Sequence, residues 1–102
     1  METVTVKSRA GDLRVVKIAH HRNGISGVGF YVVLFYWDDR HMIATVFAEK
    51  GYVSVLDRAD VVSGEIAFDA GDFKGGDFEN GLRKAISKSR LVGLKARDKW
   101  QI

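Results

Sequence analysis

Hydrophobic positions concentrate in one long run that is apolar on both faces of a strand. Val28–Trp37 reads VGFYVVLFYW, and a short polar break separates it from Met42–Ala48, which reads MIATVFA. Neighbouring side chains of a strand point to opposite faces, so the first run carries large apolar groups on each face. The two runs predict a central antiparallel hairpin over residues 28–48.

The polar break at Asp38-Asp39 predicts the hairpin turn and, with it, the pairing of the two strands. A turn at this dipeptide, or a longer one over Asp38–His41, sorts the side chains into two faces. A three-residue loop would exchange the two faces of the second strand, so that each of its side chains would lie on the other side of the sheet. The sequence leaves this alternative open. If the turn has two or four residues, the side chains divide as follows. One face carries Phe30, Val32, Leu34, Tyr36, Ile43, Thr45 and Phe47, and the other carries Tyr31, Val33, Phe35, Trp37, Met42, Ala44, Val46 and Ala48.

Three shorter alternating segments flank the hairpin. Thr3–Lys7, Leu13–Ala19 and Tyr52–Leu56 are rich in β-branched or aromatic residues and predict further strands. Between the second strand and the hairpin, His20–Gly27 is polar and contains Asn23-Gly24, which tolerates positive φ. We therefore expect a loop over His20–Gly27.

A single helix is expected after these strands. Asp77 is a good N-cap residue for a helix over residues 78–91 that closes near Gly93. Between the last main strand and this helix we expect a short helical turn or loop at 57–64, a short strand at 65–68 and an irregular segment at 69–77. Residues 95–102 are expected to form a mobile tail, or to fold back through Trp100 and Ile102.

These elements predict a single α+β domain over residues 1–102. It contains an antiparallel sheet of about five strands and one C-terminal amphipathic helix packed on one face. The second apolar face then has to be closed by barrel curvature, by the tail or by another subunit. We predict a homodimer through an apolar sheet face, with interface or pocket residues Tyr31, Val33, Phe35, Trp37, Met42 and Val46.

Composition narrows the function classes. The chain is 46% hydrophobic and 28% charged, as in ordinary globular proteins, and it has no cysteine, which excludes disulfides, thiolate metal sites and thiol catalysis. The longest apolar run is shorter than the roughly 20 residues of a membrane helix. We expect an intracellular, cytoplasmic protein with no membrane partner.

Charge is distributed unevenly along the chain. The net charge is +3 over residues 1–37, −5 over 38–77 and +5 over 78–102. A basic patch contributed by both ends would attract nucleic acid or another polyanion. The strands-then-helix order is also similar in outline to small single-strand-binding regulators built from a curved sheet and one helix. The candidate phosphate contacts are Arg9, Arg14, Arg22, Arg83, Lys84, Lys88 and Arg90.

Other chemistries have weaker support. His20-His21 with His41 could supply three metal ligands, and His41 beside Asp38-Asp39 could act as a general base. Surface histidines are far commoner than metal ligands, and turn chemistry alone selects Asp-Asp at a β-turn. The glycine-rich segment 70–77 lacks the ending of a phosphate-binding loop. We therefore predict no catalytic residue, no metal site and no cofactor.

The sequence supports three functional hypotheses. The first is a small binding module associated with nucleic acid. The second is a partner-binding or structural protein with no ligand. The third is a small-molecule-binding domain, or a minor enzyme, with an apolar pocket between sheet and helix, for which Tyr31, Trp37 and His41 would be the lining.

Overall fold

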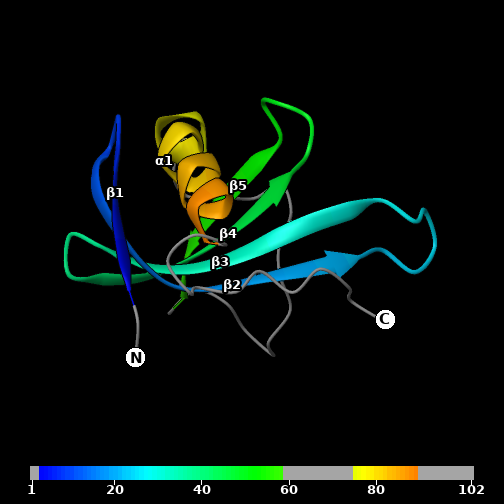
Figure 1. Ribbon diagram of the computed structural model, residues 1–102, viewed down its shortest axis with the longest axis horizontal. Coiled ribbons are helices and arrows are strands. Elements are labelled where there is room, and N and C mark those ends of the chain that lie inside the picture. Colours follow the sequence, from blue (N-terminus) through cyan, green and yellow to red (C-terminus); the bar gives the residue numbers. More distant parts are fainter. Residues whose placement is uncertain (1–2, 59–74, 90–102) are drawn as a thin grey trace.

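The computed structural model describes residues 3–58 and 75–89 and has the α+β fold that the sequence predicts. Five strands follow one another in a meander and pair in the order β1-β2-β3-β4-β5, all antiparallel. One helix lies against one face of this sheet (Figure 1). The elements are β1 (Val4–Ser8), β2 (Gly11–Arg22), β3 (Gly29–Trp37), β4 (Arg40–Phe47), β5 (Val53–Asp57) and α1 (Gly75–Lys88).

The central hairpin is formed by β3 and β4, and the turn that joins them contains two residues. Asp38 and Asp39 both have positive φ, 49° and 59°, which is typical of tight two-residue hairpin turns. The pairing Phe35↔Met42 then follows. The register expected for an Asp38-Asp39 turn is therefore confirmed. The two aspartates are the central residues of this turn.

α1 covers the odd-numbered face of β3. Its apolar side buries Phe78, Leu82 and Ala85, and it packs most closely on β1, with further contacts to β5, β2 and β4. The ring of Phe78 lies 6.0 Å from that of Phe35 and meets Trp37 edge-on at 5.1 Å. The hydrophobic core therefore lies between α1 and the sheet.

The opposite face of β3 is buried over part of its length. Phe30 is 6% exposed and Val32 is 8% exposed, and Thr45 and Leu56 beside them on β4 and β5 are buried as well. The sequence argument for a dimer was that an apolar sheet face would otherwise remain in water. That argument does not apply to these positions, and the dimer itself stays a prediction.

Boundaries predicted from the sequence are wrong for β2 and for both ends of the helix, which ends at Lys88 and not near residue 91. β2 continues to Arg22, because residues 20–22 pair with residues 29–31 of β3; the predicted loop over His20–Gly27 is reduced to residues 23–28. The helix begins at Gly75, so Asp77 lies in its first turn and is not the N-cap. There its carboxylate still complements the positive end of the helix dipole.

Glycine at position 75 is what allows this early start. A Cβ on Gly75 would overlap the carbonyl group of Val53, so only glycine lets the helix approach β5 this closely. The segment 65–68, the residues after 58 in the segment 57–64, the tail 95–102 and Arg90 lie outside the described residues.

A β-bulge in β2 determines which of its side chains face α1. The register with β3 shifts between Val15 and Lys17, so Val16 is an extra residue. Val15 pairs with Phe35, while Ile18 pairs with Val33 and His20 with Tyr31. Cross-strand partners share a face. The bulge therefore places His20 and Arg22 on the same side of the sheet as α1.

Candidate nucleic-acid-binding groove

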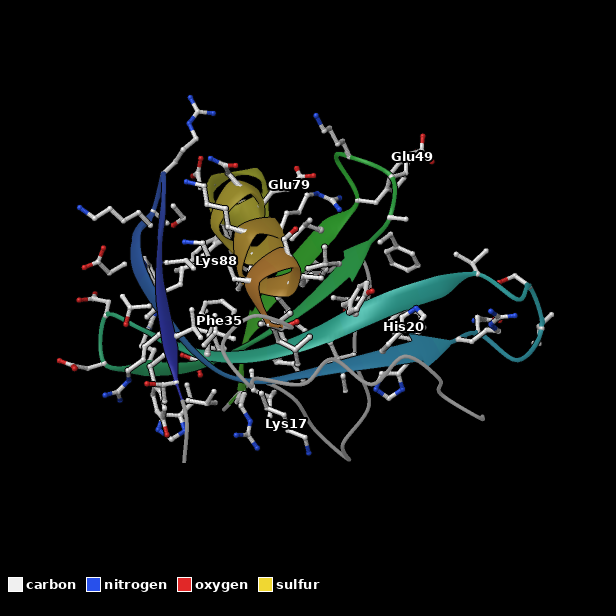
Figure 2. All side chains as sticks on the ribbon, viewed as in Figure 1. Lys17, His20, Phe35, Glu49, Glu79 and Lys88 are labelled. Carbon is white, nitrogen blue, oxygen red and sulfur yellow. The ribbon has the colours of Figure 1, made fainter. Side chains whose placement is uncertain are left out.

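A groove lies between the far end of the β2–β3 hairpin and the β4–β5 hairpin. Its volume is about 630 Å³, within the usual range for ligand sites. His20 and Glu49 lie on its two sides (Figure 2). The lining residues are His20, Arg22, Val28, Gly29 and Tyr31 from the first hairpin and Phe47, Ala48, Glu49 and Tyr52 from the second.

Rings dominate the floor of this groove. The imidazole of His20 stacks on the ring of Tyr31, with centroids 4.7 Å apart and an angle of 29°. Gly29 makes room for this stack, because a Cβ there would lie only 2.8 Å from His20 Nε2. Tyr52 is 58% exposed and offers a ring from the opposite side. The groove thus presents accessible aromatic surface to a ligand.

The β4–β5 side of the groove is held to α1 by hydrogen bonds to an ion pair of the helix, Glu79 with Arg83. Glu79 Oε2 accepts a 2.8 Å hydrogen bond from Arg83 Nε and a 2.9 Å hydrogen bond from the backbone N–H of Gly51. Arg83 also donates to the carbonyl oxygens of Ala48 and Glu49, at 3.4 and 2.8 Å. The hydrogen bond from Gly51, followed by that from Arg83, lowers the pKa of Glu79. The turn that carries Tyr52 is therefore held in place.

Arg22 is the basic residue of the groove, and Glu49 opposes it. Arg22 is exposed at the end of β2, and Glu49 is exposed in the β4–β5 turn. Glu49 is the one acid among the described lining residues. The groove therefore combines rings with one positive and one negative side chain.

The candidate phosphate contacts do not form one patch. Arg9 is exposed in the β1–β2 turn, and Lys84 and Lys88 are exposed on α1, whose main packing partner is β1. Arg14 lies over the ring of Tyr36, 4.6 Å from its centroid, on the face of the sheet away from α1. Arg83 holds Glu79 and two carbonyl groups, so Arg22 alone of the described set lines the groove.

The residues predicted for an interface or pocket also separate. Val33, Phe35, Met42 and Val46 are buried in the core under α1. Trp37 donates a 2.8 Å hydrogen bond from Nε1 to the carbonyl of Ala10. Of these six residues, Tyr31 lines the groove. The groove lies beside the helix and involves neither Trp37 nor His41.

The histidine and aspartate candidates take structural positions. His20 and His21 are neighbours on β2 and point to opposite faces; His21 stacks on Phe30 at 5.4 Å. Burial, and secondly the neighbouring His20, lower the pKa of His21. His41 meets the ring of Tyr36 edge-on at 4.3 Å. Within residues 3–58 and 75–89, no three His, Asp or Glu residues are grouped so that they could hold a metal ion.

Sequence reasoning missed Phe47, Tyr52 and Val28 as groove residues. For two of them the sequence holds a signal, a large apolar residue directly after a glycine at Gly27-Val28 and Gly51-Tyr52, whereas Phe47 has none. This signal could not be interpreted without the bulge that places His20 and Arg22 on the same side of the sheet as α1. No protein-family model, curated protein or solved structure matches this chain. No helix in the described part of the chain is long and apolar enough to cross a bilayer.

Proposed function

We propose that this protein is a binding module for single-stranded nucleic acid and that the groove holds the strand. The observation that carries the proposal is the combination of accessible rings and Arg22 in one groove. Single-strand binders join a positively charged path for the backbone to aromatic side chains on which bases stack. The proposal assigns no catalytic residue.

Charge on the β2–β3 hairpin supports this proposal. From Leu13 to Trp37 the chain contains Arg14, Lys17 and Arg22 and no Asp or Glu. A segment of one sign of charge raises the local concentration of a polyanion and speeds its association. Arg14 and Lys17 lie on the face away from α1 and would contribute to this field at a distance, whereas Arg22 lines the groove and would contact a phosphate.

Tyr52 and Tyr31 would supply the stacking surfaces. Tyr52 is exposed and adjoins the turn fixed by Glu79, while Tyr31 is half-buried and supported from one side by His20. Replacement of a stacking aromatic by alanine typically costs about 1–3 kcal/mol of binding free energy per base. We assign base stacking to these two rings and phosphate binding to Arg22.

Fluorescence anisotropy with a labelled oligo-dT tests the proposal. Tyr52→Ala should weaken binding by about 5- to 150-fold. Arg22→Gln should reduce the slope of log affinity against log salt by about 0.7, the value for one phosphate on a single strand. Lys84→Gln removes an exposed charge that does not line the groove, and it should leave both quantities close to wild type.

Two outcomes contradict the proposal. One is no change in anisotropy at low salt with the wild-type protein. The other is a larger loss with Lys84→Gln and Lys88→Gln than with Arg22→Gln, since the phosphate contacts would then lie on α1. Circular dichroism of each variant checks that the fold is retained.

The volume of the groove also favours a second candidate, a small planar ligand. A mononucleotide and oligonucleotides of increasing length distinguish the two. If a mononucleotide saturates the groove as tightly as a long oligonucleotide, the ligand is a small molecule. An affinity that rises with length supports strand binding.

A homodimer is a separate proposal about the partner of this chain. The support is the cross-strand pair Leu34 and Ile43, which lies on the face of the sheet away from α1 and is only partly buried. The contact would have to use a surface other than the face of Val33 and Phe35, because α1 covers it. Sedimentation velocity over a range of concentrations tests it, and a monomer throughout contradicts it.

A further inference from the structure

The β2–β3 hairpin ends in a tip loop, residues 23–28, that is held together by its own hydrogen bonds. Asn23 Oδ1 accepts from the backbone N–H groups of Ile25 and Ser26, both at 2.9 Å. The backbone of Asn23 donates to the carbonyl of Val28 and accepts from the N–H of Gly27, again at 2.9 Å. Ser26 Oγ accepts from the N–H of Val28 at 3.2 Å. The loop therefore has a defined shape.

This loop presents an isoleucine to solvent. The side chain of Ile25 is 99% exposed, and Val28 beside it is 49% exposed. Together with Tyr52, these are the large hydrophobic residues that are exposed in the described part of the chain. Val28 belongs both to the tip loop and to the lining of the groove. The exposed apolar surface is thus continuous with the groove.

The charges around the tip favour a negatively charged partner. Arg22 precedes the loop, and residues 13–37 contain no acid. An apolar tip on a cationic hairpin suits a partner that combines negative charge with apolar surface. The faces of nucleic-acid bases are such apolar surfaces, and proteins insert Ile, Leu, Phe or Met between bases for this reason.

We propose that Ile25 inserts between two neighbouring bases of the strand that occupies the groove and separates them. This inference rests on the proposed function, because the groove has to hold the strand for the tip to reach it. Burial of Ile25 between two base faces replaces the contact of those faces with each other. The hydrogen bonds of Asn23 keep the side chain in position, so little order has to be gained on binding.

The test uses 2-aminopurine, whose fluorescence rises when it loses its stacked neighbours. It is placed within a single-stranded oligo-dA, and binding is followed in parallel by anisotropy. Wild-type protein should raise the fluorescence when the base lies at the contacted step. Ile25→Ala should abolish the rise and weaken binding by about tenfold, the effect expected when the contact of one aliphatic side chain is lost.

Two further variants separate insertion from a general defect. Ile25→Leu keeps an aliphatic group of the same size and should retain the fluorescence rise. Asn23→Ala removes the two 2.9 Å hydrogen bonds but keeps Ile25, and it should reduce the rise while leaving the salt slope unchanged. Thermal unfolding monitors the fold of each variant.

The outcomes distinguish the inference from the proposed function. If wild-type protein does not bind the oligonucleotide, the proposed function fails and the inference fails with it. If wild-type protein binds, but 2-aminopurine at every position keeps its fluorescence, strand binding stands and the insertion is wrong. Equal affinities of wild type and Ile25→Ala would also refute the insertion.

Discussion

The guanidinium of Arg83 binds the carboxylate of Glu79 at 2.8 Å, and this pair fixes α1 to the β4–β5 turn. Arg83 was a candidate phosphate contact in the sequence. In the structure its donors are engaged by Glu79 and by the carbonyls of Ala48 and Glu49. The pair therefore positions one side of the groove and does not provide its charge.

Glu79→Gln should lower the free energy of unfolding by about 1 kcal/mol at pH 7, because the hydrogen bonds from Gly51 and Arg83 lose their charged acceptor. The folded pKa of Glu79 lies below its ordinary value of 4.5. Its contribution is present above that value and is lost as pH falls through the lowered folded pKa. Urea unfolding of both proteins should show a difference that shrinks in acid. A difference that is constant with pH would contradict this role.

Glu49→Gln should strengthen the binding of an anionic strand. Glu49 is a lining residue opposite Arg22, and its negative charge repels phosphate. Exposed charges contribute about 0.2–1 kcal/mol, so the affinity should rise up to about fivefold at low salt. Asp12→Asn is the matched control, since Asp12 is exposed at the start of β2 and does not line the groove. An equal gain from both variants would show a general charge effect.

Gly81→Ala should destabilise the protein although alanine favours helix. A Cβ at this position would lie 2.9 Å from Ser8 Cβ, 3.0 Å from the carbonyl oxygen of Lys7 and 3.1 Å from Leu13 Cδ1. Overpacking of this kind costs about 1–3 kcal/mol. Gly76→Ala faces open space in the same helix and should stabilise by up to about 1 kcal/mol. Thermal unfolding checks both variants. A lower unfolding temperature for Gly81→Ala and a higher one for Gly76→Ala would confirm the packing of α1 on β1.

Stability should fall as pH is lowered below about 6.5 because of His21. Burial and the neighbouring His20 lower its pKa in the folded state below the ordinary value of 6.5. The unfolded chain then binds a proton more readily, so stability is lost between 6.5 and the lowered folded pKa. His21→Phe keeps a ring against Phe30 and should flatten this pH dependence. An unchanged slope in urea unfolding would contradict the assignment.

The sequence was sufficient for the class of fold and for placing the hairpin turn at Asp38-Asp39, while the structure decides the register of the hairpin. Val28–Trp37 has apolar residues on both faces, and Asp38-Asp39 accommodates the positive φ values of a two-residue turn. These are local properties of the chain. The helix face of Phe78, Leu82 and Ala85 follows in the same way from the spacing of its apolar residues.

The groove could not be predicted, because it depends on contacts between distant segments. Because of the bulge at Val16, His20 and Arg22 lie on the same face of the sheet as α1. No residue type in β2 predicts a bulge at this position. The polar residues His20–Arg22 favoured a loop, but in the structure they pair with residues 29–31 and extend the strand. In the sequence, Gly75 favoured an irregular segment. The structure shows that a glycine is needed there because α1 lies against the backbone of Val53.

Photocrosslinking tests most directly the claim that a single strand lies in the groove. The protein is irradiated with oligo-dT, and the crosslinked residues are identified by mass spectrometry. Strand binding in the groove should give crosslinks at Tyr52 and Tyr31, and these should be lost when a competing strand is added. Crosslinks confined to α1 around Lys84 and Lys88, or none at low salt, would contradict it.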